Sequence, residues 1–305
     1  MNCNLCPRSC NVDRNVNKGF CGMTNDIYAA RAALHMWEEP CISGNNGSGA
    51  VFFSGCTLRC IFCQNYEIAA AQAGKKITVG RLSDIFLELQ DKCANNINLV
   101  TATHFVPQVA EALINAKNKG LVIPVVYNSS AYENVETLKM LDGLVDVYLP
   151  DMKYIDSSLS AEYSKAPDYA EIAKLAIHEM VRQTGKPEFF DADDELVKSG
   201  RVEDGIMKKG VIVRHLVLPG TTKDSKAVIK YLLETYADDI YISIMSQYTP
   251  FERLKNHPLL SRKITRREYD SVVDYAIECG INNGFIQERN VARESFIPEF
   301  DYEGI

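Results

Sequence analysis

Short apolar runs and amphipathic segments alternate through most of the chain. The apolar runs are rich in β-branched residues and cover 50–55, 96–100, 121–127, 145–149, 211–218 and 240–245, with a further candidate at 284–288. Segments with helical spacing of apolar residues cover 83–94, 107–119, 133–142, 169–184, 224–237 and 266–279. Continuous apolar strands that alternate with such helices predict an α/β fold with a parallel sheet covered by helices. Six βα units favour a doubly wound sheet or a partial barrel, with functional side chains at the carboxyl ends of the strands.

Two stretches depart from this alternation. Residues 1–23 are rich in Cys and poor in regular pattern, and a Gly/Ser/Asn-rich turn follows at 43–49. Residues 185–209 are polar and predict a solvated connection, with a lid or a partner-docking element as the alternative. We therefore predict three parts: a Cys-rich N-terminal extension (1–49), the unit of alternating strands and helices (50–290) and a C-terminal tail (291–305).

Composition and charge exclude several classes of protein. Hydrophobic residues make up 46% of the 305 residues, and the formal net charge is −7. This acidity argues against a general nucleic-acid binder and against attachment to an anionic membrane surface. No apolar run approaches the roughly 20 residues that span a bilayer. The opening residues MNCNLCPRSC lack the apolar core of a signal peptide, so we expect a cytoplasmic protein.

Ten cysteines are distributed unevenly along the chain. One group lies within the first 21 residues and a second within 56–63, while Cys41, Cys93 and Cys279 stand apart. Clustered cysteines in a reducing compartment indicate metal ligands or catalytic groups rather than disulfides. Cys93 and Cys279 fall in helical patterns, which predicts that both are small buried apolar residues.

The second cysteine group has the spacing of an iron–sulfur site. Cys56, Cys60 and Cys63 form C-x3-C-x2-C directly after the first apolar run, within GCTLRCIFCQN. Three thiolates from one loop can hold three irons of a [4Fe–4S] cube and leave the fourth iron open to a small molecule. The alternatives are a zinc site or chance spacing, but structural zinc sites normally close with four ligands.

This motif, with Phe62 before its last Cys, resembles the signature of the radical S-adenosylmethionine (radical SAM) superfamily. Runs over residues 3–250, among them CPRSCNV, EEPCISG, FCQNYEIA, YLPDMKY and RHLVLPG, resemble the pyruvate formate-lyase activating enzyme group and its activating-enzyme-like branch. The resemblance implies a partial (β/α)6 radical SAM barrel. It also implies that one electron from the cluster cleaves S-adenosylmethionine to methionine and a 5′-deoxyadenosyl radical, which abstracts hydrogen from a substrate.

Under this resemblance, the residues after the second and third strands contact S-adenosylmethionine. In VTATHF, where many relatives read GGE, Thr101 and Thr103 are candidates for the amino group. His104 is a candidate general acid/base or ligand contact, with a structural role as the alternative. In YNSSAY, which resembles the TNG segment of the activating enzymes, Asn128 and Ser129 are candidates for the ribose and methionine part.

The later strands supply charged candidates for the same cofactor. In LPDMKY, which resembles a DLK motif, Asp151 and Lys153 alternate and so point to one side of the chain. Lys153 would pair with the methionine carboxylate and Asp151 would bind a cation or orient Lys153, with a surface ion pair as the alternative. Arg214 lies in an apolar strand, where an unpaired charge is costly, so we expect it to face a carboxylate. Gln247 stands where some activating enzymes have His, which leaves its role open.

The N-terminal cysteines form a second candidate metal site. Cys3, Cys6, Cys10 and Cys21 follow C-x2-C-x3-C-x10-C, with Gly on both sides of the last. Four thiolates fit both an auxiliary [4Fe–4S] cluster, which we favour slightly, and a structural zinc. Cys41 could replace one ligand, although a structural role is the preferred interpretation.

The leading hypothesis is a radical SAM oxidoreductase that abstracts hydrogen from a protein or peptide, including the activation of a glycyl radical enzyme. Flavodoxin or ferredoxin would donate the electron. The alternatives are the same chemistry on another peptide or a small molecule, and a non-enzymatic iron–sulfur sensor or scaffold. The open iron favours an enzyme over the sensor.

Overall fold

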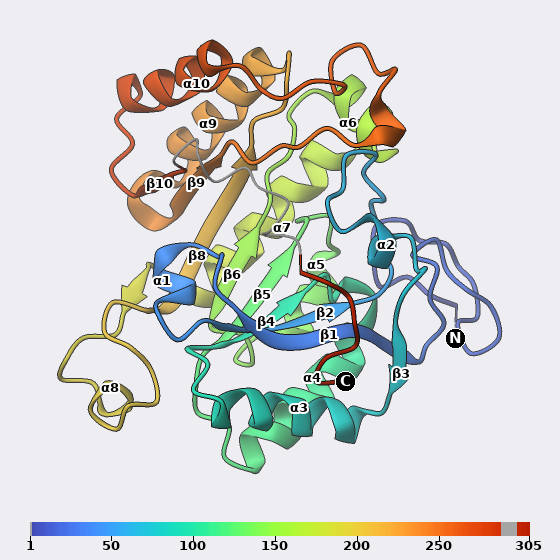
Figure 1. The fold of residues 1–305 in the computed structure, drawn as a ribbon, viewed down its shortest axis with the longest axis vertical. Coiled ribbons are helices and arrows are strands. Elements are labelled where there is room, and N and C mark those ends of the chain that lie inside the picture. The colour runs from blue at the N-terminus through green and yellow to red at the C-terminus, as the bar shows by residue number, and fades with distance from the viewer. Residues whose placement is uncertain (1, 288–297) are drawn as a thin grey trace.

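One ten-stranded sheet organises residues 2–287 and 298–305, which the computed structural model describes (Figure 1). The strand order is β10-β9-β8-β6-β5-β4-β2-β1-β3, with β7 paired to β8. The strands are β1 (Ile27–His35), β2 (Ser48–Phe53), β3 (Lys75–Ile77), β4 (Ile97–Val100), β5 (Val125–Ser129), β6 (Val147–Pro150), β7 (Glu188–Phe189), β8 (Met207–Leu216), β9 (Tyr241–Met245) and β10 (Gly284–Ile286).

The strands from β2 to β10 that follow one another in the sheet are parallel, whereas β1 and β3 join its edge antiparallel. Every residue of β2, β4, β5 and β6 is buried, because each strand has helices on one side and the barrel interior on the other. The sheet is open between β10 and β3. The predicted α/β partial barrel is therefore confirmed.

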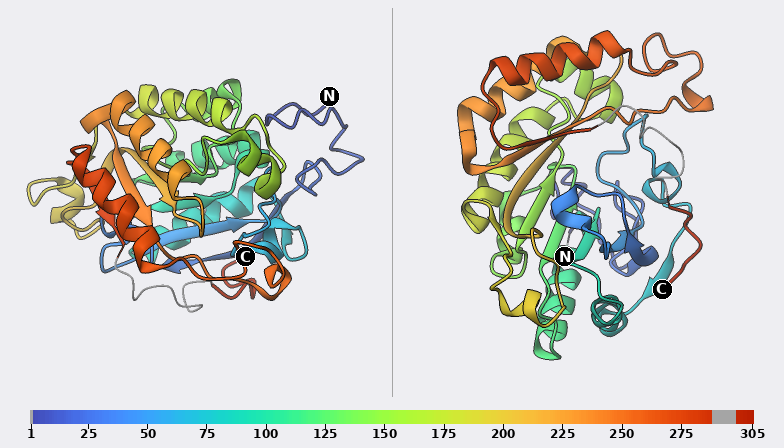
Figure 2. Two further views of the ribbon diagram at one scale, coloured as in Figure 1. Left: turned by 90° about the horizontal axis from the view of Figure 1, so that it is seen from above. Right: turned by 60° about the vertical axis from the view of Figure 1, so that its left-hand side comes forward.

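Helices cover the outer face of this sheet (Figure 2). The α-helices are α1 (Pro40–Ser43), α2 (Tyr66–Ala69), α3 (Val79–Asp91), α4 (Val106–Asn118), α5 (Val135–Leu138), α6 (Ser157–Ser164), α7 (Tyr169–Thr184), α8 (Glu195–Lys198), α9 (Thr222–Tyr236) and α10 (Arg266–Glu278). Short 3-10 turns are η1 (Thr103–Phe105), η2 (Lys139–Leu141), η3 (Ala237–Asp239) and η4 (Glu252–Leu254). Side-chain caps at Thr78 and Thr265 fix where α3 and α10 begin.

Alternate residues of the inner strands enter two separate apolar clusters. Val125 and Tyr127 pack in the large outer cluster with the helices, whereas Val126 between them packs in an inner cluster with Cys41 and Ile42 of α1. This division follows from the period of two along a strand. Helix α1 therefore packs against the inner face of the strands, and Cys41 is one of its buried apolar side chains there.

Several local expectations differ from the structure. Residues 27–35, where no strand was predicted, form β1, which pairs antiparallel with β2 and β3. The polar segment 185–209 contains β7, α8 and the start of β8. The prediction that Cys93 and Cys279 are buried is wrong, since both are exposed. Each lies just beyond its helix, Cys93 with a φ of 62° and Cys279 as the C-cap of α10, so the helical periodicity does not extend to them.

The C-terminal residues 298–305 run beside β1. Ala32 N–H donates to the Glu303 carbonyl at 2.8 Å, and Arg31 pairs with Asp301 at 2.7 Å. Residues 291–297 of the predicted tail lie outside the described residues. The proposed boundaries at 49 and 290 stay a prediction. Within the described residues, no helix combines the length and apolarity needed to cross a membrane.

Candidate active site

A cavity of about 660 Å³ lies at the carboxyl ends of the parallel strands. Most of the site residues predicted from the sequence line it, and these are Cys56, Cys60, Cys63, Thr101, Asn128, Ser129, Asp151, Lys153, Arg214 and Gln247. They meet because parallel strands bring the ends of segments that are far apart in sequence to a single edge.

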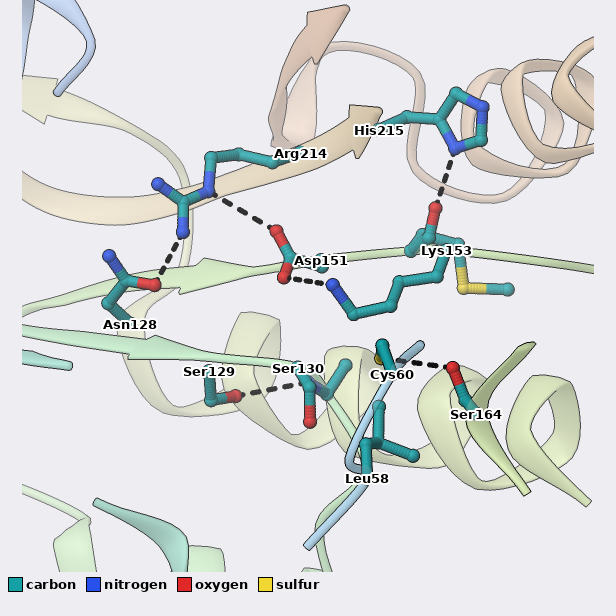
Figure 3. Close-up of polar contacts among 12 residues, drawn as sticks. Leu58, Cys60, Asn128, Ser129, Ser130, Asp151, Lys153, Ser164, Arg214 and His215 are labelled. Carbon is teal, nitrogen blue, oxygen red and sulfur yellow. Dashed lines mark hydrogen bonds and ion pairs between the residues drawn. The ribbon is translucent and has the colours of Figure 1, made fainter. Parts of the chain in front are cut away.

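The cysteine loop that follows β2 forms one wall of this cavity. Gly55 turns the chain with a φ of 88°, and a Cβ there would lie 2.7 Å from the Cys21 carbonyl oxygen. Leu58 N–H donates to Cys56 Sγ at 3.4 Å, and Ser164 Oγ donates to Cys60 Sγ at 3.0 Å (Figure 3). The Phe62 ring packs edge-on against Tyr154 and Tyr163, which fixes the loop from behind.

The three thiols fit a cluster better than a single ion. Burial, together with the nearby Cys56 and Cys60 thiols, raises the pKa of Cys63 to about 12. Among residues 2–287 and 298–305, no three His, Cys, Asp or Glu side chains converge closely enough to hold one metal ion. Separated thiols that face one cavity suit a [4Fe–4S] cube, in which each thiolate binds a different iron.

Lys153, Asp151 and Arg214 form a row of charged groups in the cavity lining, and Lys153 lies near Cys60 (Figure 3). Lys153 Nζ lies 2.6 Å from Asp151 Oδ2, and Arg214 Nε lies 3.4 Å from Asp151 Oδ1. Burial alone would raise the pKa of Asp151, but Lys153 and Arg214 outweigh it and lower that pKa. Burial would likewise lower the pKa of Lys153, but Asp151 and the Cys60 thiol raise it. These groups therefore stay charged inside the cavity.

Arg214 also pairs with Glu38 and interacts electrostatically with Glu39, two acidic residues that the sequence analysis did not select. Its Nη1 lies 2.9 Å from Glu38 Oε2, and Asn98 Nδ2 donates to Glu38 Oε1 at 2.9 Å. The adjacent Glu39 is 8% exposed, its Oε2 has no hydrogen-bond partner, and burial raises its pKa. The only sequence signal for this pair is two acids before Pro40 in EEPCISG. If Glu38, Glu39 and Asp151 are all counted as ionised against Lys153 and Arg214, the formal net charge of the lining carboxylates and cations is −1.

Backbone strain marks the end of β4. Thr101 lines the cavity with a φ of 63°, which is rare for a β-branched residue, and its N–H donates to the Asn128 carbonyl at 2.9 Å. Such strain is concentrated at functional sites. Farther along the wall, Gln247 Oε1 accepts a hydrogen bond from Gln287 Nε2 at 3.1 Å.

Thr103 and His104 do not line the cavity. Thr103 Oγ donates to the buried Glu133 at 2.7 Å, and His104 Nε2 lies 2.7 Å from the Ser54 carbonyl. Burial lowers the pKa of His104 to about 3, so its ring is neutral and donates this bond. The chain changes direction at the strained Thr101, so the side chains of Thr103 and His104 pack into the protein rather than into the cavity. His215 also points away from Arg214, toward the Met152 carbonyl at 2.7 Å (Figure 3).

The N-terminal cysteines lie behind the cysteine loop and outside the cavity. Cys56 N–H donates to the Cys21 carbonyl at 3.3 Å, so the two cysteine groups are in direct backbone contact.

Comparison with known proteins gives one sequence relative and several similar structures. An uncharacterized protein of Methanocaldococcus jannaschii is 28% identical over 282 residues, which cover 90% of this chain and 74% of the relative. The structure of Streptococcus suis SuiB bound to S-adenosylmethionine has 14% identity and a TM-score of 0.49 over 76% of this chain and 48% of SuiB. HydG, a maturase of the [FeFe]-hydrogenase, has 13% identity and a TM-score of 0.50 over 79% of this chain and 52% of HydG.

This chain thus spans about half the length of these two solved structures, and at such identities the likeness to HydG concerns the fold alone. The sequence profile of the radical SAM superfamily, in contrast, matches residues 50–232, which is more than half of the chain and includes the cysteine loop. The chain belongs to the radical SAM superfamily.

Proposed function

We propose that this protein cleaves S-adenosylmethionine reductively and uses the resulting radical to abstract hydrogen from a protein or peptide. A [4Fe–4S] cluster and S-adenosylmethionine, when bound, supply one-electron chemistry that yields methionine and a 5′-deoxyadenosyl radical. Cys56, Cys60 and Cys63 would hold the cluster. The observation that carries the proposal is that these three thiols share one cavity with the fixed charges of Asp151, Lys153 and Arg214.

In this proposal, the residues at the strand ends bind and orient S-adenosylmethionine. The Lys153 ammonium pairs with the methionine carboxylate, and Asp151 holds the ammonium in position through the 2.6 Å contact. Thr101, Asn128 and Ser129 line the cavity. Thr101 would face the amino group, and Asn128 and Ser129 would face the ribose and methionine part. The cavity's net charge of −1 suits a sulfonium cation.

A peptide substrate is supported by the mouth of the cavity as well as by the resemblance to activating enzymes. Trp37 and Ile286 line the cavity and are 59% and 45% exposed, so large apolar side chains border its entrance. Exposed apolar rims of this kind mark binding surfaces. A glycyl radical enzyme is the preferred partner within this class. We further propose a cytoplasmic location and a flavodoxin or ferredoxin as the electron donor.

The test compares wild type with a Cys56→Ala/Cys60→Ala/Cys63→Ala variant after anaerobic reconstitution with iron and sulfide. Dithionite and S-adenosylmethionine are added, and 5′-deoxyadenosine and methionine are measured. We expect equal amounts of the two products from wild type and neither from the variant. Absence of products from wild type that carries its full iron content and binds S-adenosylmethionine, in the presence of candidate peptides, would overturn the proposal.

A further inference from the structure

The four N-terminal cysteines lie close enough to interact electrostatically, because the Cys21 thiol interacts with those of Cys3, Cys6 and Cys10. Cys3 N–H donates to the Val12 carbonyl at 2.8 Å, and Asn11 N–H donates to the Cys3 carbonyl at 3.1 Å, so the chain folds back on itself. Cys6 and Cys21 are 7% and 6% exposed. The cysteines therefore approach one another through local turns rather than through a regular helix or strand.

Gly19 borders the gap between two of the sulfur atoms. A Cβ at this position would lie 3.3 Å from Cys10 Sγ and 3.4 Å from Cys21 Sγ. Its backbone φ is outside the left-handed region, so the gap, rather than the conformation, is what excludes a side chain. The same point is 4.0 Å from Cδ of Arg14, which places a guanidinium group at the edge of the sulfur cluster.

Arg14 is buried here without an acidic partner. It is 4% exposed, its two terminal nitrogens donate to the carbonyls of His104 and Thr24, and its Nε has no partner. Arg8, on the other side, donates to the carbonyls of Thr57 and Ser164 at 2.7 and 3.0 Å. Within the described part of the chain, neither guanidinium pairs with a carboxylate. A buried charge without compensation is costly, so the buried Arg14 guanidinium favours a negatively charged group beside it.

We propose that Cys3, Cys6, Cys10 and Cys21 hold a second [4Fe–4S] cluster, separate from the site at residues 56–63. Four thiolates and a 2+ cluster core sum to a charge of −2, which offsets the charges of Arg8 and Arg14. The unpartnered Nε–H of Arg14 is a donor available to a sulfur atom, of the kind that tunes such clusters.

Zinc fits this geometry less well. A tetrahedral zinc with Zn–S distances of about 2.3 Å requires sulfur atoms roughly 4 Å apart around one point. In the described residues no three candidate ligands converge in that way. A cube spreads its four thiolates over four irons, so its ligands do not have to meet around a single point.

The second cluster would also support the cysteine loop of the candidate active site. Arg8 binds the Thr57 carbonyl at 2.7 Å, and the Cys21 carbonyl accepts the Cys56 N–H at 3.3 Å. Both contacts come from residues within or beside the N-terminal site. This proposal is independent of the proposed reaction, because it concerns metal content alone.

The test uses the full-length Cys56→Ala/Cys60→Ala/Cys63→Ala variant, which lacks the first site. It is reconstituted anaerobically with iron and sulfide in the presence of equimolar zinc. We expect about four irons and four sulfides per chain, visible charge-transfer absorption, and an EPR signal after reduction with dithionite. Further Cys6→Ser and Cys21→Ser replacements should remove all three. One zinc per chain, or no bound metal, would overturn the proposal.

A glycine substitution tests the same proposal if the cysteine replacements unfold the chain. Gly19→Ala, made in the same background, would place a methyl group between the two sulfurs and should remove at least half of the bound iron. Gly80→Ala is the matched control, because its Cβ would meet no atom closer than 3.8 Å and its φ is ordinary. Full iron content in both glycine variants would refute the packing of the cluster beside Gly19.

Discussion

Arg214→Met tests the electrostatic organisation of the cavity. Arg214 is 13% exposed and pairs with Glu38 at 2.9 Å and Asp151 at 3.4 Å, and its charge opposes the burial that raises the pKa of Glu39. Met has a similar reach and fits an apolar strand. Its substitution leaves three acids against Lys153, which changes the cavity's charge from −1 to −2. The remaining carboxylates then repel one another in a site that excludes most water.

The expected cost follows from burial. Removing one partner of a buried ion pair typically destabilises a protein by about 3–5 kcal/mol. For a chain of this size, that corresponds to a drop of roughly 5–15 °C in Tm. Without Arg214 the pKa values of Glu39 and Asp151 rise. A carboxyl with a raised folded-state pKa contributes stability at low pH that is lost as the pH rises through that pKa. The deficit should therefore be larger at about pH 8 than at about pH 5.

Calorimetry or circular dichroism of the anaerobically purified protein measures this difference at the two pH values. Arg266→Met is the control, because Arg266 is 82% exposed and contacts Asp270 on the surface of α10 at 3.4 Å. Exposed ion pairs contribute at most about 1 kcal/mol to stability. The Tm of this variant should therefore fall only slightly, and by the same amount at both pH values. A Tm loss for Arg214→Met that matches the control, or that does not change with pH, would refute the reasoning.

Three further predictions concern single side chains. Burial raises the pKa of Glu133 from 4.5 to about 7, so wild type loses about 3 kcal/mol of folding stability as the pH rises through that range. Glu133→Gln cannot titrate, and its Tm should therefore differ less between about pH 5 and pH 8 than that of wild type. Equal Tm differences in the two proteins would contradict this prediction. Lys153→Met should weaken S-adenosylmethionine binding to the reconstituted protein by about 10–100-fold in equilibrium dialysis. The control variant Lys174→Met, which removes the surface pair with Glu171, should bind S-adenosylmethionine like wild type. Equal affinities of the two variants would show that Lys153 does not bind the cofactor. Ser164→Ala removes the 3.0 Å hydrogen bond to Cys60 Sγ and should lower the reduction potential of the bound cluster in an EPR-monitored titration, whereas an unchanged or higher potential would argue against it.

The sequence by itself determined the parallel barrel and the location of its functional edge. Apolar runs with helical segments between them predict strands that are buried on both faces. The spacing of apolar residues within each segment is enough to distinguish its strands from its helices. Residues such as Asp151 and Lys153 could be selected because they directly follow such a run. Their meeting with Cys56 needs no further information, since the carboxyl ends of parallel strands share one edge.

Only the tertiary structure decided which side chains meet across the barrel. Glu38 lies 176 residues from Arg214 along the chain, and no local pattern connects them. The turn at Thr101 likewise sends Thr103 and His104 behind the wall, because a single φ of 63° redirects the chain where the sequence shows only a polar strand end. The gap beside Gly19 and the buried Arg14 depend on contacts between loops. The periodicity of a helix or strand follows from its own residues. The contacts described here instead depend on how the strands of the sheet are arranged and on the space that the surrounding loops leave between side chains.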